Sequence, residues 1–384
     1  PSGKGGSASL AGAFSVNSLD GNTEALVSQV ALLNAGLLVV DAQRSGKIRA
    51  LAAGGSLAAR GPAVAGSVAI NESKHTIRAQ VQGARSANTT DNAVGGDLSI
   101  HAANATRLQS LAGALAAGSS VGYGAAVAFN DTANTVEASL DDSNSLRRGG
   151  SLSVLAIGST TDLPDPSNPS QAVAPTIESL SGALGASGSS GGAGTVSVNL
   201  IADTVTAAVR NSSDAQDADH HTTAGGAVTV LASAAPTIHS VSGAVGLSGG
   251  GAFGAALGWN DIGTTVRARI DGASLHSAGA LLVDARSTPV FQSLSAGLAG
   301  AGGNALAASL SLNQLRAQVE ALVTGSSSLT AAGGDVQISA TGDSRLESLA
   351  GGLAGSGGSA LGVATAINLV QGGVLAKIDS SHVT

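Results

Sequence analysis

The chain has 384 residues, a formal net charge of −7, 11% charged residues, 2% aromatic residues and no cysteine. The charge is sparse and spread along the chain, which excludes the concentrated basic surface of a nucleic-acid-binding protein. Without cysteine, disulfide and thiolate chemistry are excluded, and stability depends on packing and hydrogen bonding. Because aromatic residues are so few and Gly numbers 55, we expect a thin core of Ala, Val, Leu and Ile.

One segment recurs along the chain, and its fullest copy is SLSGALGASGSSGGAGTVSVNLIADTVTA at residues 179–207. Five copies open with Ser and an aliphatic residue and reach an Asn 20 residues later, and a sixth opens at Ala50-Leu51. An Ala stands eight residues after each Asn. The recurring Asn are Asn17, Asn71, Asn130, Asn199, Asn260, Asn313 and Asn368, and the Ala are Ala25, Ala79, Ala138, Ala207, Ala268, Ala321 and Ala376.

The intervals between successive Asn range from 53 to 69 residues, so length varies only in the part of the repeat that follows the Ala. This pattern is typical of stacked modules with surface insertions. We expect one elongated array, a fragment of a longer chain, with insertions at 158–176 and 211–223. Its units are residues 1–49, 50–109, 110–178, 179–239, 240–292, 293–347 and 348–384.

Turn-forming Gly residues precede short aliphatic alternations, and this turn-then-strand signal also recurs. It occurs as GLLVVDA at 36–42, GGDLSIHA at 95–102, GGSLSVLA at 149–156, GGAVTVLA at 225–232, GALLVDA at 279–285 and GGDVQISA at 333–340. Further strand candidates are the Ser-Leu opening, the stretch before each Asn and the TVTAAV-like stretch after it. Ala favours helix, but frequent Gly and the period of two in residues 195–199 favour strand.

These elements predict an all-β, repetitive β-solenoid in which each unit covers the apolar face of the next. The recurring Asn would then lie on one line and form an amide ladder. With about three coils of roughly 20 residues per unit, the array would be a rod on the order of 90 Å long, at about 4.8 Å per coil. The alternative is a stack of antiparallel hairpins with the Gly-rich centre GASGSSGGAG at the tip.

Two patterns suggest chemistry but are better explained structurally. The GxSxG pattern occurs at 118–122, 188–192 and 246–250, in register with the repeat and without a His partner, so it does not predict a nucleophile. His220 and His221, with Asp217 and Asp219, are weak candidates for a divalent-metal site. A solvated polar loop explains these four residues better, because their spacing matches no closed metal site.

Carboxylates give no stronger signal. Asp141, Asp142 and Asp203 could supply a pair of the kind that cleaves polysaccharides, but no pattern places two of them across a cleft. The GGD sequences at Gly95 and Gly333 lack the second Gly and Asp of calcium-binding nonapeptides. We therefore predict no catalytic residue, no metal and no cofactor, and we do not expect an enzyme.

The unit SLSGALGASGSSGGAGTVSVNLIADTVTAAV, followed by GGAVTVLAS, resembles repeats of filamentous haemagglutinin-like and leukotoxin-type filamentous adhesins of Gram-negative bacteria. The resemblance covers essentially the whole chain. It implies a right-handed parallel β-helix, export by a two-partner or autotransporter route through an outer-membrane transporter, and a secreted or cell-surface location. No catalytic residues accompany these repeats in the family.

The resulting expectation is a non-enzymatic stalk or fibre segment of a surface adhesin, active in attachment, biofilm or cell contact and virulence. Its expected partners are a host or bacterial surface protein or glycan, and further copies of itself end to end, because open sheet edges pair. One alternative is a β-helix that binds or cleaves polysaccharide, which turnover of a glycan would reveal. A further alternative is a pore-forming toxin segment, suggested by the uncharged Gly/Ala stretches and testable by liposome leakage.

Overall fold

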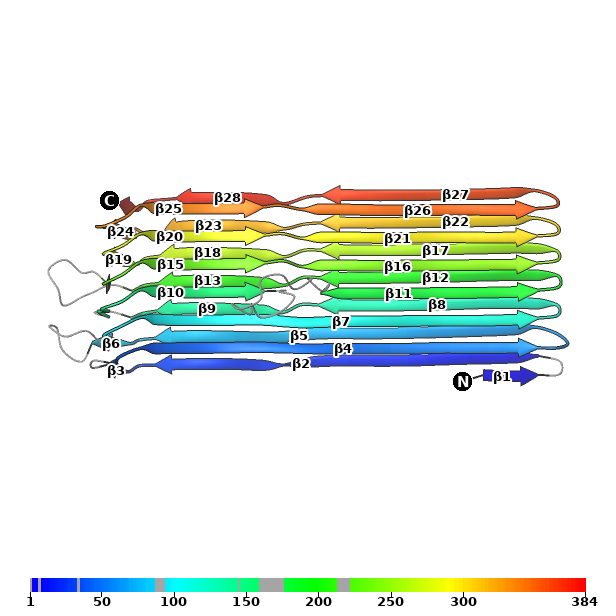
Figure 1. Ribbon diagram of the computed structural model, residues 1–384, viewed down its shortest axis with the longest axis horizontal. Coiled ribbons are helices and arrows are strands. Elements are labelled where there is room, and N and C mark those ends of the chain that lie inside the picture. The colour runs from blue at the N-terminus through cyan, green and yellow to red at the C-terminus, as the bar shows by residue number, and fades with distance from the viewer. Residues whose placement is uncertain are drawn as a thin grey trace.

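The computed structural model describes residues 2–5, 8–32, 35–86, 94–143, 146–158, 176–212 and 222–384. Within these ranges the regular structure is entirely β-strand, with no helix (Figure 1). The strand prediction for the Ala-rich segments is therefore confirmed. Every strand pair among the described residues is parallel, as expected for a β-solenoid.

Two large sheets lie face to face and run through the whole stack (Figure 1). The eleven-stranded sheet contains β1 (Ser2–Gly5), β4 (Leu38–Ala58), β7 (Leu98–Gly118), β10 (Leu152–Gly158), β11 (Ile177–Ser187), β15 (Val228–Ala234), β16 (Thr237–Ser248), β20 (Leu281–Ser287), β21 (Val290–Ala301), β25 (Val336–Gly342) and β26 (Arg345–Ser356). The twelve-stranded sheet contains β2 (Ser9–Ser28), β5 (Ala63–Gln82), β8 (Val121–Thr132), β9 (Thr135–Asp141), β12 (Ser190–Ile201), β13 (Thr204–Arg210), β17 (Gly251–Ile262), β18 (Thr265–Asp271), β22 (Ala305–Leu315), β23 (Gln318–Thr324), β27 (Ala360–Val370) and β28 (Gly373–Ile378).

Two smaller sheets lie along one side of the stack, at the end of each coil where the chain passes from one large sheet back to the other (Figure 1). The four-stranded sheet contains β14 (Thr222–Ala224), β19 (Ser274–Ser277), β24 (Ser328–Ala331) and β29 (His382–Val383), and the two-stranded sheet contains β3 (Ala31–Leu32) and β6 (Arg85–Ser86). One coil thus runs along the eleven-stranded sheet, turns, returns along the twelve-stranded sheet and closes through a short third side.

Each repeat unit forms one coil, not three. β16 pairs with β21, the same strand of the next unit, and the partners Ser240 and Ser293 are 53 residues apart. The expectation of about three coils per unit was therefore wrong, and so was the 90 Å rod. The strands, not the stacking direction, run along the longest axis of the molecule (Figure 1). The short apolar runs in the sequence suggested coils with short sides. In the structure, consecutive strands such as β15 and β16 lie end to end in the same sheet and form one long side of the coil.

The Gly-rich centre of each unit is a turn between the two large sheets. β11 and β12 flank this turn, yet each pairs with strands of other coils and the two belong to different sheets. The two strands face each other across the interior without pairing, so the turn closes an arch. The alternative of stacked antiparallel hairpins is therefore wrong.

The long sides are continuous in the first coils and divided in the later ones. β4 and β7 are uninterrupted strands of 21 residues. In later coils the same side divides into two strands, and Pro236 and Pro289 lie at the break. Proline lacks the N–H that a ladder needs and therefore marks the division.

Two different interiors lie on either side of this break. We call the part of each coil from the Ser-Leu opening to the recurring Asn the arch half, and the remainder the core half. The core half contains a conventional core of Val, Leu, Ile and the recurring Ala, in which Val205, Ala207 and Val209 are fully buried. A row of larger residues, including Ile177, Ile238 and Phe291, separates the two halves.

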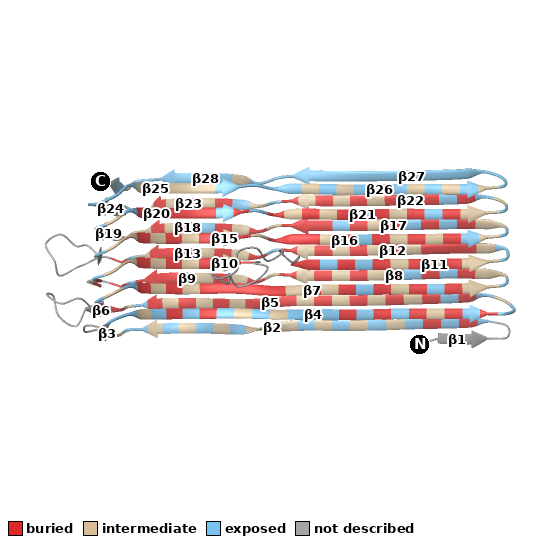
Figure 2. Ribbon diagram, in the orientation of Figure 1, coloured by how far each residue is buried: buried red, intermediate tan, exposed pale blue. Residues whose placement is uncertain are grey.

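The arch half reverses the usual distribution of side chains. Its buried rows consist of Ala, Gly, Ser, Thr and Asn, and its hydrophobic cluster is made of Ala alone. A Cβ added to Gly185 would lie 1.8 Å from the carbonyl oxygen of Gly192 on the facing strand, so the two backbones touch there. Larger aliphatic residues must face outward, and buried and more exposed positions alternate along these strands (Figure 2).

Candidate functional site: the polar ladders of the stacked coils

The seven recurring Asn form one continuous hydrogen-bonded ladder. Each Asn Nδ2 donates to the Oδ1 of the next: Asn17 to Asn71 at 3.0 Å, Asn71 to Asn130 at 3.0 Å, Asn130 to Asn199 at 2.8 Å, Asn199 to Asn260 at 2.7 Å, Asn260 to Asn313 at 2.8 Å and Asn313 to Asn368 at 2.8 Å. The strand register creates the ladder, because it places each Asn directly opposite the next.

The ladder also ties the two large sheets together. Asn71 Nδ2 donates to the Gln109 carbonyl oxygen at 2.9 Å, and Asn130 Nδ2 donates to Ser110 Oγ at 2.8 Å. Both acceptors lie on the facing sheet, beside the Ser-Leu opening. The amides from Asn71 to Asn313 are fully buried. Since buried polar groups are stable only when hydrogen-bonded, the ladder fixes both the register and the spacing of the sheets.

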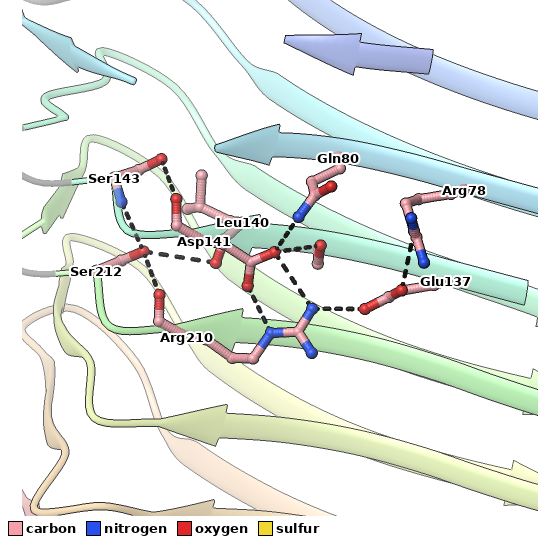
Figure 3. Close-up of polar contacts among 9 residues, drawn as sticks. Arg78, Gln80, Glu137, Leu140, Asp141, Ser143, Arg210 and Ser212 are labelled. Carbon is pink, nitrogen blue, oxygen red and sulfur yellow. Dashed lines mark hydrogen bonds and ion pairs between the residues drawn. The ribbon is translucent and has the colours of Figure 1, made fainter. Parts of the chain in front are cut away.

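A second ladder, of charged residues, lies on the outer surface of the core half (Figure 3). Arg78 Nε donates to Glu137 Oε2 at 3.1 Å, and Arg210 Nη2 donates to Glu137 Oε1 at 2.5 Å. Arg210 Nε also donates to Asp141 Oδ1 at 2.5 Å. Gln80 Nε2 donates to Asp141 Oδ2 at 2.7 Å, so five side chains join three successive coils.

Charge pairing outweighs burial at Arg210. Burial by itself lowers the pKa of this guanidinium, but the hydrogen bonds and charges of Asp141 and Glu137 raise it, and the net pKa lies above its usual range. The guanidinium therefore stays charged, and the ion pairs clamp neighbouring coils. Charge-assisted bonds of this geometry are stronger than neutral ones.

Sequence reasoning missed this charged ladder, although the sequence contains a signal for it. The residue immediately before each recurring Ala lies on the outer face, and successive coils pair these positions. In chain order they are Glu24, Arg78, Glu137, Thr206, Arg267, Glu320 and Leu375. Mostly alternating charge at one fixed place in the repeat indicates ion pairs between stacked units.

The GxSxG segments lie in the turns of the arches. Ser190 Oγ is 2.7 Å from the Tyr123 hydroxyl, and Ser248 Oγ accepts from the Gly250 N–H at 3.0 Å. These bonds are structural contacts in and beside the turns. The metal candidates Asp217, Asp219, His220 and His221 lie outside the described residues. In the part of the chain that the structure describes, no group of three His, Asp or Glu side chains could hold a metal ion.

Two of the three carboxylates considered for catalysis have structural partners. Asp141 accepts from Arg210 and Gln80, as described above. Asp203 is buried, and its Oδ1 accepts from the Asn134 N–H of the preceding coil at 2.8 Å. Asp142 has a positive φ of 48° and lies exposed at the end of β9. These three side chains do not form an acid/base pair.

Two buried basic side chains have no hydrogen-bond partner among the described residues. The guanidinium of Arg148 is buried, and burial lowers its pKa to about 9. Both ring nitrogens of His75 are unpaired, and burial lowers the pKa of this imidazole, with Arg44 adding to the effect. Unpaired buried charge destabilises a fold, so these two side chains are candidates for pH-dependent stability.

The geometry of the site is thus a set of ladders. Comparison with protein families, with curated proteins and with solved structures finds no match. The described residues also include no helix long and apolar enough to cross a membrane.

Proposed function

We propose that the chain is a non-enzymatic structural segment of a large secreted or surface-exposed bacterial adhesin, of the kind its repeats resemble. In this role a transporter of the outer membrane exports the parent protein, and the stacked coils support domains that act in attachment, biofilm or cell contact. A host or bacterial surface protein or glycan is the proposed partner of those domains.

One observation carries the proposal: every coil binds the next through the same contacts. Backbone pairing and the Asn ladder join equivalent positions of successive units, and ion pairs such as Arg78–Glu137 and Arg267–Glu320 do the same between some of the coils. Such an array lengthens by adding units without redesign, which is what a fibre requires. The unpaired outer edge of β27, which pairs only with β22, is the surface on which a further coil or a second copy would add.

A unit-number series tests the structural role. His239 pairs with Gln292 and Ser240 with Ser293, so residues 240–292 can be duplicated or deleted without breaking the register. Each added unit should lengthen the stack by about 4.8 Å, and each deleted unit should shorten it by the same amount. Cryo-electron microscopy of the purified chains measures this length. A stack whose length does not follow unit number contradicts the proposal.

The non-enzymatic part has its own test. The chain is incubated with a panel of bacterial and host polysaccharides, and released reducing ends are counted. We expect no turnover, because Asp141 and Asp203, two of the carboxylates considered for catalysis, are engaged in structural hydrogen bonds. Sustained release of reducing ends would overturn this part of the proposal while leaving the stacked architecture intact.

A further inference from the structure

Both outer faces of the arch half are apolar. On the eleven-stranded sheet the outward residues include Leu115 and Leu298, with 45% and 38% of their surface exposed. On the twelve-stranded sheet they include Phe253, Trp259 and Leu306, at 41%, 42% and 46%. Stacked coils repeat these positions, so each face carries rows of large apolar side chains rather than scattered ones. Contiguous apolar surface of this kind marks an interaction site.

Charge is excluded from the same region on every side. In the six complete arches, residues 50–71, 110–130, 179–199, 240–260, 293–313 and 348–368, the only charged residue is Arg60, at a turn. Polar and charged residues begin at one boundary on both faces: Glu178 and Glu347 directly precede the Ser-Leu openings, and Asp131 and Asp261 directly follow the Asn. The boundary between uncharged and charged residues therefore lies at the same level on both faces of the arch half.

The backbone of the arch half is satisfied from coil to coil, including at the turns. Gly249 N donates to the Ser187 carbonyl oxygen at 3.2 Å, and Gly302 N donates to that of Ser248 at 3.0 Å. Inside the arch, Ser179 Oγ and Ser197 Oγ lie 2.8 Å apart, next to the Asn ladder. A lipid environment requires this internal pairing, since hydrocarbon offers no hydrogen bonds.

The depth of the uncharged region matches a bilayer. From Ser179 to Ser187 the strand covers about nine residues, or roughly 30 Å at 3.3 Å per residue, and the hydrocarbon core of a bilayer is about 30 Å thick. We infer that the arch half embeds in the hydrocarbon of a phospholipid bilayer, with Glu178, Glu347, Asp131 and Asp261 at the level of the headgroups. The core half remains in water.

A second copy of the chain fits these observations less well. A face-to-face contact between two copies would require one apolar face, but not a charge boundary at the same level on both faces, nor turns without charge. A bilayer surrounds both faces and the turn at once, and so accounts for all three. In hydrocarbon the outer edge of β27 requires a partner strand, from a further coil or from a second copy.

The single tryptophan of the chain provides a direct probe, because Trp259 lies on the outer face of β17 in the arch half. The protein is mixed with vesicles of neutral phosphatidylcholine. We expect the emission of Trp259 to shift to shorter wavelength, and lipids brominated in their acyl chains to quench it. Dye enclosed in the vesicles should stay inside, since Gly185 and Gly192 bring the two sheets into contact and leave no channel.

Two lysine variants sharpen the test. Leu298→Lys places a charge in the middle of the arch half, and we expect vesicle partitioning to fall at least tenfold. Thr206→Lys makes a matched change on the outer face of the core half and should leave partitioning unchanged. Circular dichroism and thermal unfolding without lipid establish that both variants are folded.

Several results would overturn the inference. If Trp259 emission does not change when vesicles are added, the arch half does not contact lipid. Equal partitioning of Leu298→Lys and the unaltered protein would lead to the same conclusion. A blue shift that appears without lipid and grows with protein concentration would assign the apolar faces to a second copy. Release of enclosed dye would show a pore rather than a solid embedded slab. None of these results would alter the unit-number series.

Discussion

At the scale of single residues, the Asn ladder is the most specific structure in the molecule. Asn199 accepts from Asn130 at 2.8 Å and donates to Asn260 at 2.7 Å, and all three amides are fully buried. Removing the Asn199 amide leaves the Asn130 donor and the Asn260 acceptor without their ladder partner. An unpaired buried polar group costs about 1–3 kcal/mol, which exceeds the net value of the bond itself.

We therefore expect Asn199→Ala to lower the free energy of unfolding by about 2–5 kcal/mol in guanidinium titrations. The matched control is Asn368→Ala, since Asn368 is exposed and has a single ladder partner, Asn313. Its loss should be about 1 kcal/mol or less. Equal losses at the two positions would mean that the ladder carries no special stability.

His75 predicts a pH dependence. Burial and, secondarily, the charge of Arg44 lower its folded-state pKa below the ordinary 6.5, while Asp20 acts weakly in the opposite direction. Below about pH 6.5 the unfolded chain then binds a proton that the folded chain does not, so stability falls as the pH decreases. His75→Gln should flatten this decline between pH 7 and 5 in the free energy of unfolding. The same exchange at exposed His382 serves as the control, and an identical flattening there would contradict the assignment.

At the scale of elements, the arch depends on glycine for close approach rather than for turn conformation. A Cβ on Gly185 would lie 1.8 Å from the Gly192 oxygen and 2.5 Å from the Gly122 oxygen, and backbone atoms cannot move aside as a flexible side chain can. On the same strand, Gly182 faces outward, and a Cβ there would meet nothing within 4 Å.

Gly185→Ala should therefore destabilise the protein by about 3 kcal/mol or more, because it forces the two sheets apart. Gly182→Ala should be neutral or slightly stabilising, since alanine restricts the unfolded chain without a clash. Thermal unfolding of the two variants gives the comparison. Similar melting temperatures would show that the sheets are not in backbone contact at Gly185.

At the scale of the whole molecule, stability is shared among coils that contact only their neighbours. Deleting residues 240–292 removes one coil and lets residues 179–239 pair directly with residues 293–347 through equivalent positions. The dependence of unfolding free energy on denaturant, the m value, follows the surface exposed on unfolding. We expect it to fall by roughly a seventh, in proportion to chain length. A much larger fall, or loss of cooperative unfolding, would contradict additive coils.

At this scale the arch half and the core half also differ from each other. The core half is a conventional solenoid with buried Val, Leu and Ile and a charged surface. The arch half has a small polar-lined interior and an apolar surface. This reversal within one coil supports the assignment of water to one half and lipid to the other.

The sequence by itself was enough for the repeat, the strands and the line of Asn. Each of these depends on recurrence at fixed spacing, and recurrence is preserved when units stack in register. The alternation in Thr195-Val196-Ser197-Val198-Asn199 indicated a strand, and β12 contains it. The charged residues before the recurring Ala also occupy a fixed place in the repeat. The sign of their charge changes from coil to coil, so the sequence alone does not show them as one row.

Only the tertiary structure decided how many coils a unit makes and which face of each arch strand is inside. A period of two separates Leu180, Leu184 and their row from Ser179, Ser181 and Ala183, but both rows are free of charge, and the usual rule would bury the leucines. The facing strand settles the choice. Because Gly185 and Gly192 bring the two backbones into contact, the space between the sheets accommodates only small side chains, and the leucines turn outward.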